Sequence, residues 1–539
     1  MKSDLEIAHS MQLRPIQEIA AGLGLSDEEL VPYGRYIAKV PLAVMDRLAA
    51  RPTGRLILVT AMTPPPKGAG KTTTTIGLSQ ALVRCGHRTV AAIREPSLGP
   101  CMGMKGGAAG GGYSQVLPME DINLHFTGDL HAVTMAHNLC AAVVDNHLHH
   151  RSSPEIHPRK VVWKRVLDMN DRALRHVIVG LMDDGLNGVM REAGFEITAA
   201  SEVMAILCLA DGLPDLKHRL GRIIVGYDSL RRPITAADVG VHGAMAVLLK
   251  HALNPNLVQT TEGTAAFVHG GPFANIAHGC STLSATRMAL QLADFVVTEA
   301  GFGADLGAEK FIHIKCRAGN LRPAAAVLVV PRAAFDCHGL ANVCKHVENL
   351  RNFGVPVVVS INKFADDDPQ QLQQIQLQCR DNGIEACISD FREAGGEGGL
   401  ELAEAVARAA NTDSGPLRFL YPLDMPLSEK IETVAGRIYG AGRVEWTTDA
   451  KREIRQMETL GYGNLPICVA KTPMSLTDNP KVAGCPKDFT ITVTNAKVSA
   501  GAGFVVVYVG QIMTMPGLPK EPAALQIDID DRGVITGLF

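Results

Sequence analysis

The sequence predicts an α/β protein with one large parallel-sheet domain and two smaller α/β or α+β domains. Residues 56–60 form a short apolar run of the strand type, residues 71–85 have helical spacing, and residues 89–93 form a second strand-like run. Strand, helix and strand in this order make a βαβ unit, whose two strands are parallel. The chain has 539 residues, a length that suggests roughly three or four domains or one large domain with appendages.

The α/β pattern continues far along the chain. Further strand-like runs lie at residues 295–298, 325–330 and 355–361, and a helical segment lies at 341–353. After residue 465 the sequence pattern changes. An alternating run lies at 489–493 and a short apolar run at 504–509, separated by Gly and Pro. We therefore predict a first domain over 1–340, a second α/β domain over 341–464 and a small β-rich domain over 465–539.

The composition is that of an ordinary globular protein. The formal net charge is -3, 46% of the residues are hydrophobic and 20% are charged. A nearly neutral chain has no general attraction to nucleic acid or to an anionic membrane. Acidic residues occupy the start where a signal peptide would be apolar, and no apolar run approaches the ~18 residues of a membrane span. We expect a cytoplasmic protein whose 12 scattered cysteines are reduced.

Residues 67–75, Lys-Gly-Ala-Gly-Lys-Thr-Thr-Thr-Thr, have the pattern of a phosphate-binding loop between a strand and a helix. Gly68 and Gly70 would let backbone N–H groups converge on phosphate oxygens at a helix N-terminus. Lys71 would reach the phosphates and Thr72 would place its hydroxyl on Mg²⁺. Pro65 stands where the strict pattern has Gly, so the loop is a variant. It favours a P-loop NTPase-like large domain over a mere Gly-rich turn.

Arg94 follows the strand at 89–93, at the edge where ligands bind parallel sheets. It is placed to hold a small carboxylate or an acyl phosphate, although a surface ion pair with Glu95 or a neighbour is an equal alternative. Residues 103–113 contain six Gly, which points to a backbone anion nest or a close chain crossing, with a flexible linker as the alternative. Glu299 and Asp305 would bind Mg²⁺ through water or cap Gly-rich turns.

Long sequence blocks resemble those of the formate–tetrahydrofolate ligase family over essentially the whole chain. The most specific block runs from Arg94 to Tyr113, and others lie at His269–Cys280, Thr298–Phe311 and Ile512–Leu518. The resemblance implies synthesis of 10-formyltetrahydrofolate from ATP, formate and tetrahydrofolate, through formyl phosphate. It also implies a homotetramer.

The resemblance implies roles for single residues. Arg94 and Lys71 would be catalytic, and Arg94 would hold formate and formyl phosphate. Thr72 would serve Mg²⁺, Glu95 would bind a monovalent cation such as K⁺ or NH₄⁺, and Phe364 would pack on the folate pterin. The ATP-binding set would be Thr63, Lys67, Gly68, Ala69, Gly70, Lys71, Thr72, Thr73, Gly301 and Gly303.

The chain also departs from the family pattern. Ala69 stands where Glu is usual in the loop, and the segment after Gly339 is shorter than usual. Arg392 replaces a Trp of the pterin clamp, and either Phe391 or the face of Arg392 would substitute for it. We expect an active ligase with weakened folate affinity.

Two alternatives remain at this point. The loop from Lys67 to Thr73 also resembles the deviant phosphate loop of dimeric partitioning-type ATPases, although that likeness covers the loop alone. A ligase-like chain that binds nucleotide or folate without turnover is the second alternative.

Overall fold

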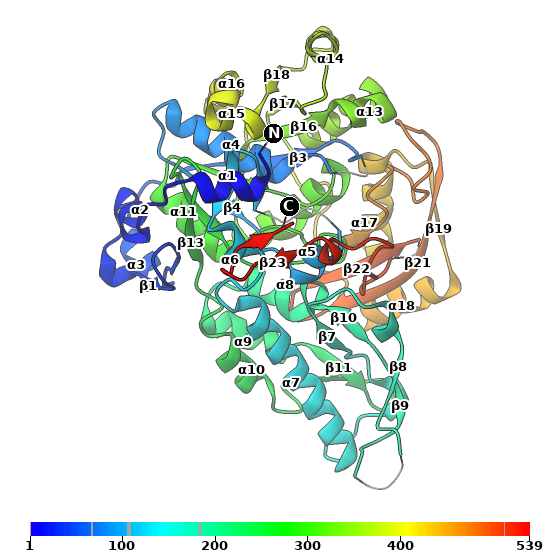
Figure 1. Cartoon of the computed structure of the whole chain (residues 1–539). Helices are drawn as coiled ribbons and strands as arrows, with labels where there is room; N and C mark the ends of the chain where they lie inside the picture. The colour runs from blue at the N-terminus through cyan, green and yellow to red at the C-terminus, as the bar shows by residue number, and fades with distance from the viewer. Residues whose placement is uncertain (1, 66–67, 105–108, 183–185, 511, 539) are drawn as a thin grey trace.

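The computed structural model describes residues 2–65, 68–104, 109–182, 186–510 and 512–538. A twelve-stranded sheet forms the centre of this described part (Figure 1). Neighbouring strands run parallel from β14 to β18, and the other end of the sheet is antiparallel. The path is β1 (Val31–Pro32), β2 (Ala38–Lys39), β13 (Asn256–Thr260), β14 (Ala265–Val268), β4 (Thr89–Ile93), β15 (Phe295–Glu299), β3 (Arg55–Ala61), β16 (Pro323–Pro331), β17 (Val357–Asn362) and β18 (Ala386–Ser389), with β6 (Ser114–Leu117) joining β13 and β5 (Gly110–Gly111) joining β6.

The central strands are apolar because both of their faces are covered. In β3, Ile57 and Val59 pack on one side against helices α4 (Lys71–Arg84) and α16 (Leu400–Asn411). Leu56 and Leu58 point to the other side, where they belong to the largest hydrophobic cluster. Successive side chains of a strand point to opposite faces, so a strand buried on both faces reads as an unbroken apolar run.

Helix α4 begins directly after Gly70 and ends near the position predicted for it. Its buried Thr74, Thr75 and Ser79 hydroxyls each donate a hydrogen bond to the carbonyl oxygen four residues earlier. These bonds explain how a helix rich in Thr can lie against the sheet, since buried hydroxyl groups need partners. Gly86 follows the helix with a φ of 88°, the left-handed backbone that is typical of a glycine helix stop.

A second sheet contains four strands, in the order β19-β21-β22-β20. Its strands are β19 (Arg443–Trp446), β20 (Ile467–Ala470), β21 (Thr490–Ser499) and β22 (Phe504–Val509). The predicted C-terminal β-rich segment is thus present, but β19 joins it from before residue 465. Likewise β17 and β18 extend the main sheet past residue 340, because β17 pairs in parallel with β16. The three domain boundaries stay predictions.

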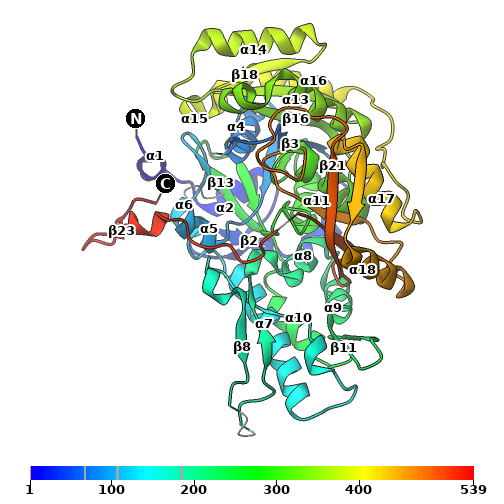
Figure 2. The ribbon, with the colours of Figure 1, turned by 90° about the vertical axis from the view of Figure 1, so that its right-hand side faces the viewer.

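Helices cover the main sheet and build the lower part of the molecule in Figure 1, where α7, α9 and α10 lie together. Figure 2 shows α13, α14 and α16 over the opposite end. The longer helices are α7 (Asp129–His149), α8 (Glu202–Leu209), α9 (Leu213–Gly221), α10 (His242–Leu249), α11 (Leu283–Leu292), α13 (Arg332–Asn352), α14 (Pro369–Asp381), α17 (Leu427–Val434) and α18 (Thr448–Thr459). Within α13, Gly339 breaks the helical backbone with a φ of 72°.

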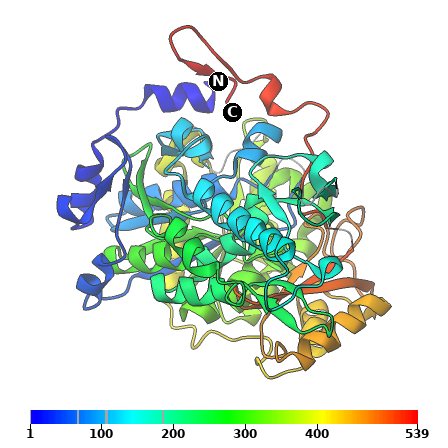
Figure 3. The ribbon, with the colours of Figure 1, turned by 90° about the horizontal axis from the view of Figure 1, so that it is seen from below.

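The two ends of the chain lie close together in all three ribbon views, most openly in Figure 3. Leu5 of α1 (Asp4–Ser10) and Leu538 belong to the same hydrophobic cluster. Within the described ranges, no helix combines the length and apolar character needed to cross a membrane.

Candidate active site

The predicted phosphate loop lies between the end of β3 and the start of α4. Gly68 and Gly70 have positive φ angles of 86° and 77°. A Cβ on Gly70 would stand 2.4 Å from the side-chain nitrogen of Asn362, which itself donates to the carbonyl of buried Ala69. Glycine is therefore required at position 70 both by the backbone and by this contact. Lys67, predicted to bind ATP, lies outside the described residues.

The first turn of α4 brings a hydroxyl group onto a buried carboxylate. Thr72 Oγ1 donates a 2.9 Å hydrogen bond to Oε2 of Glu299, which ends β15 and is 1% exposed. Oε1 of Glu299 has no hydrogen-bond partner among the described residues. Carboxylate and hydroxyl oxygens are ligands that Mg²⁺ prefers, so this donor set fits the predicted magnesium position.

Lys71 and Arg94 place two cations beside that carboxylate. The Arg94 guanidinium lies 3.7 Å from Glu299 Oε1. Burial lowers the pKa of Lys71 to about 8, Glu299 raises it and Arg94 lowers it further. Two partly desolvated cations at a helix N-terminus repel each other until an anion lies between them. The arrangement can therefore bind phosphate or a small carboxylate, which favours the anion-binding interpretation of Arg94 over a simple surface pair.

Glu95 points away from solvent and is 4% exposed. Its Oε2 has no hydrogen-bond partner within the described residues. Burial raises the pKa of Glu95 well above its usual value, Asp129 adds to this, and Lys39 opposes it. A bound cation would stabilise the ionised carboxylate here, so the environment fits the predicted monovalent-cation role.

Gly301 and Gly303, predicted to bind ATP, lie in the turn that follows β15. A Cβ on Gly301 would stand 3.4 Å from Nη1 of Arg94, so this turn borders the arginine. A Cβ on Gly303 would stand 2.7 Å from Oδ1 of Asp305 and 3.3 Å from the carbonyl oxygen of Met62, at the exit of β3. The turn thus packs between two parts of the site, and its contact with ATP stays a prediction.

Thr63 was expected to bind ATP, but the structure buries it completely. Its Oγ1 accepts a 3.0 Å hydrogen bond from the Asn342 amide and lies 3.1 Å from Nε2 of His346. Both partners lie on α13, and a contact of Thr63 with ATP stays a prediction. Thr63 instead ties the exit of β3 to a neighbouring helix.

On the expected folate side, Phe364 and Phe391 differ sharply. Phe364 is 40% exposed, and its ring lies 3.9 Å from where a Cβ of Gly70 would stand. An aromatic face is therefore open beside the phosphate loop. Phe391 is fully buried against Gly77 and Gly399, each of which has no space for a side chain there. Its ring belongs to the core, and a contact of Phe391 with the pterin stays a prediction.

Arg392 is held by an ion pair that the sequence did not reveal. Its Nη2 lies 2.6 Å from Oδ1 of Asp4, which also accepts a hydrogen bond from the Gly112 backbone. A Cβ on Gly112 would stand 1.9 Å from the Arg392 carbonyl oxygen. The described end of the Gly-rich run is thus a close chain crossing, as one interpretation predicted; residues 105–108 lie outside the described residues. A folate contact of Arg392 stays a prediction.

Sequence reasoning missed Asp4, Asn342 and Asn362 as neighbours of the site. The partner of Asn342 is 279 residues away, that of Asn362 is 293 away and that of Asp4 is 388 away, so no local pattern marks them. Over the described ranges, no group of three or more His, Cys, Asp or Glu side chains could hold a metal.

Together these observations define a mixed α/β protein with an anion-binding loop at the carboxyl edge of a mostly parallel sheet. Comparison with known proteins makes the assignment more specific. The family model for formate–tetrahydrofolate ligase matches residues 2–539. The chain is also 54% identical to a formate–tetrahydrofolate ligase of Paracoccus denitrificans (strain Pd 1222) over 559 aligned positions that cover the whole of both chains. The chain therefore belongs to the formate–tetrahydrofolate ligase family.

Proposed function

We propose that this protein joins formate to tetrahydrofolate at the expense of ATP, giving 10-formyltetrahydrofolate, ADP and phosphate. The observation that carries the proposal is the convergence of Lys71, Arg94 and the Thr72–Glu299 pair beside the phosphate loop. Membership of the ligase family supports the substrate assignment. In this proposal the large domain is P-loop NTPase-like, as its loop between β3 and α4 suggests.

The first step is the phosphorylation of formate. A formate oxygen attacks the γ-phosphorus of ATP, the bond from that phosphorus to the β–γ bridging oxygen breaks, and ADP leaves. Arg94 orients the carboxylate and then the acyl phosphate, while Lys71 and the loop N–H groups neutralise the phosphate charge. Positioning and electrostatic stabilisation provide the catalysis, so no covalent intermediate with the protein is required.

The second step is transfer of the formyl group. The N10 nitrogen of tetrahydrofolate attacks the formyl carbon, the bond to the phosphate oxygen breaks, and the N10 proton leaves with the departing phosphate or to solvent. Phosphorylation is needed because formate itself has a poor leaving group. Phe364, whose exposed ring lies next to the loop, would pack on the pterin.

Two cations belong to the proposal. Thr72 and Glu299 would hold Mg²⁺ on the nucleotide, where it neutralises phosphate charge. Glu95 would hold K⁺ or NH₄⁺, since its buried Oε2 offers a ligand oxygen. A homotetrameric state and a cytoplasmic location are further proposals taken from the family resemblance.

The test is a steady-state assay of purified protein that follows 10-formyltetrahydrofolate and ADP together, with ATP, formate or tetrahydrofolate omitted in turn. The proposal predicts that both products form only when all three substrates are present. ADP release without formate or folate would favour a partitioning-type ATPase instead. Folate binding by calorimetry without any product would favour a ligase-like binding protein.

A further inference from the structure

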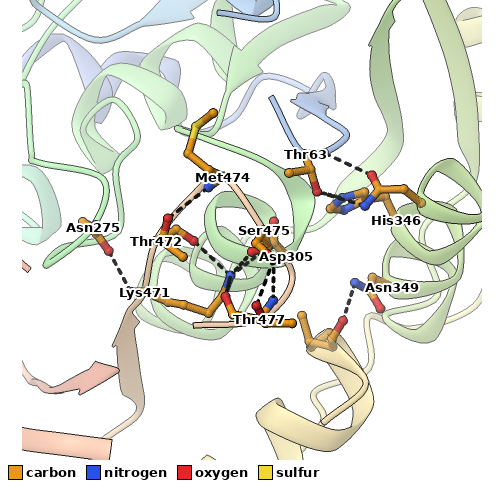
Figure 4. A network of polar contacts seen from close by, with 12 residues as sticks. Thr63, Asn275, Asp305, His346, Asn349, Lys471, Thr472, Met474, Ser475 and Thr477 are labelled. Carbon is orange, nitrogen blue, oxygen red and sulfur yellow. Dashed lines mark hydrogen bonds and ion pairs between the residues drawn. The ribbon is translucent and has the colours of Figure 1, made fainter. Parts of the chain in front are cut away.

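A buried lysine–carboxylate pair lies behind the anion-binding loop and takes no part in the two steps above (Figure 4). Nζ of Lys471 lies 3.4 Å from Oδ2 of Asp305, and both side chains are at most 1% exposed. The same nitrogen donates hydrogen bonds to the carbonyl oxygens of Thr472, Ser475 and Thr477. The segment that follows β20 is therefore wrapped around one ammonium group.

The charge of Asp305 is compensated by Lys471, whereas Lys471 has other hydrogen-bond partners. Neither carboxylate oxygen of Asp305 has a hydrogen-bond partner within the described ranges. The ammonium of Lys471, in contrast, already has three carbonyl acceptors for its three protons. Without Lys471, Asp305 would be a buried charge with no close compensation, which is strongly unfavourable.

The carboxylate belongs to the turn at residues 301–307, which leads into the short helix Ala304–Ala308 and borders the site on two sides. The backbone N–H of Gly307 donates to the carbonyl of Gly303 over 2.8 Å and closes the turn. One end of the turn, at Gly301, lies against the Arg94 guanidinium. Its middle, at Gly303, lies against the carbonyl oxygens of Ala61 and Met62. A displacement of Asp305 therefore moves the wall beside Arg94 and the exit of β3 together.

A second set of contacts joins the same C-terminal segment to the start of the loop. Asn342 Nδ2 donates hydrogen bonds to the carbonyl of Gly484 and to the hydroxyl of Thr63. The backbone N–H of Lys471 donates to Oδ1 of Asn275. Figure 4 shows the contacts of Thr63 with His346 of α13 beside those of Lys471 with Asp305.

We propose that Lys471 and Asp305 form a positioning pair for the ATP site, in which Lys471 fixes the turn at 301–307 and with it Arg94 and the exit of β3. The inference rests on the proposed function. Neither side chain touches substrate in it. Both act through the turn, whose displacement would misplace the γ-phosphate relative to formate.

The first test compares Lys471→Met with the unmodified protein. Removing the ammonium should lower kcat/KM for ATP by roughly 10- to 100-fold, the usual cost of losing a supporting contact behind a catalytic group. The KM for ATP should rise and the KM for tetrahydrofolate should stay unchanged. Binding of a non-hydrolysable ATP analogue, measured by calorimetry, should weaken in parallel.

The double variant Lys471→Met with Asp305→Asn separates positioning from simple stability. It carries no uncompensated buried charge, so its unfolding midpoint should be higher than that of Lys471→Met. Its KM for ATP should nevertheless stay raised, because the tether of the turn is missing. A double variant that binds the analogue as tightly as the unmodified protein would overturn the inference, even if Lys471→Met alone does not fold.

Lys430 offers a matched control in α17. Its Nζ is fully buried and also donates to three carbonyl oxygens, those of Leu423, Gly463 and Leu465. Lys430→Met should lower stability and leave the KM for ATP unchanged. Equal increases in the KM for ATP in the Lys430 and Lys471 variants would contradict the inference. Absence of product with the unmodified protein would instead reject the proposed function, while analogue binding still tests the pair.

Discussion

Two neighbouring buried polar clusters lie at the same edge of the main sheet, and their hydrogen bonding differs. In the first, Lys39 Nζ donates to both carboxylate oxygens of Asp129 and to Oδ1 of Asn256, over 2.7–2.9 Å. In the second, Arg94 Nε, Glu95 Oε2 and Glu299 Oε1 have no partner in the described part of the chain. The first cluster is complete without a ligand. The second is complete only when one binds.

This difference indicates what each cluster contributes. A fully paired network stabilises the fold. Removing one partner leaves a buried charge unpaired, which lowers the free energy of unfolding. A cluster with unpaired polar groups lowers stability, but it keeps those groups available to bind substrate, as is common at functional sites. Substitutions in the two clusters should therefore affect different measurements.

The largest effect is expected for Arg94→Ala. It should reduce kcat/KM for formate by about 10³-fold, because a guanidinium aimed at developing charge is lost. Affinity for a non-hydrolysable ATP analogue and the unfolding midpoint should change little. Steady-state kinetics, calorimetry and thermal unfolding measure the three quantities.

Arg94→Lys is the matched control, since it keeps the charge and loses the planar fork. Its kcat/KM for formate should fall between the values of the unmodified protein and Arg94→Ala. If ATP binding collapses in Arg94→Ala while formate is still used, the role given to Arg94 is wrong.

Lys39→Met should affect stability instead. Asp129 and Asn256 would lose their cation, at a cost of about 3–5 kcal/mol in the free energy of unfolding. Urea denaturation measures this loss. Per folded molecule, kcat/KM for formate should fall far less than in Arg94→Ala. An unchanged urea midpoint would show that the paired cluster does not stabilise the fold as argued.

Phe364 and Phe391 allow a similar comparison on the folate side, between an exposed ring and a buried one. Phe364→Ala should raise the KM for tetrahydrofolate about tenfold, the value of one aromatic stacking contact. Phe391→Ala should instead destabilise the protein by about 3–5 kcal/mol, because it empties a packed core position. Kinetics and urea denaturation on both variants give the test. A raised KM in Phe391→Ala with unchanged stability would reverse the assignment.

The smallest effect concerns pH. The pKa of Lys71 is lowered to about 8, so without nucleotide the ammonium loses its proton as pH rises through 8. Phosphate binding needs the charged form, and affinity for the ATP analogue should fall several-fold between pH 7 and pH 9. The same lowered pKa means that the folded state binds fewer protons than the unfolded state between about 8 and 10.5, so stability from this group rises with pH there.

Lys71→Arg provides the comparison for this prediction, because arginine stays charged across the range. Its analogue affinity should vary less between pH 7 and pH 9, as calorimetry at both values would show. An equal pH dependence in the two proteins would assign the effect to another group.

The local parts of the fold were predictable. The limits of β3, α4 and β4 lie within one residue of the sequence-based ranges, because apolar runs, helical spacing and a glycine stop are local signals. The order of strands was not, since β15 lies between β3 and β4 through pairing across some 200 residues. No local pattern encodes that distance.

The site was predictable to the same extent. Thr72 and Arg94 could be placed from the loop and the strand end, and Glu299 converges on both as expected for an acid at the same sheet edge. The burial of Thr63 and Phe391 could not be foreseen, because it depends on α13 and on Gly77 of the distant helix α4. Sequence shows which residues are suited to chemistry, and packing decides which of them remain accessible.

The meeting of the two chain ends has a consequence for biosynthesis. Leu538 is fully buried in the same cluster as Leu5 and Ile76, and Asp4 beside it secures Gly112 and Arg392. A chain grows from its N-terminus at the ribosome, so this cluster can be completed only after residue 538 has emerged. The helix at Asp4–Ser10 is synthesised long before Leu538, so it cannot reach its full docking surface beside the phosphate loop until synthesis has passed residue 538.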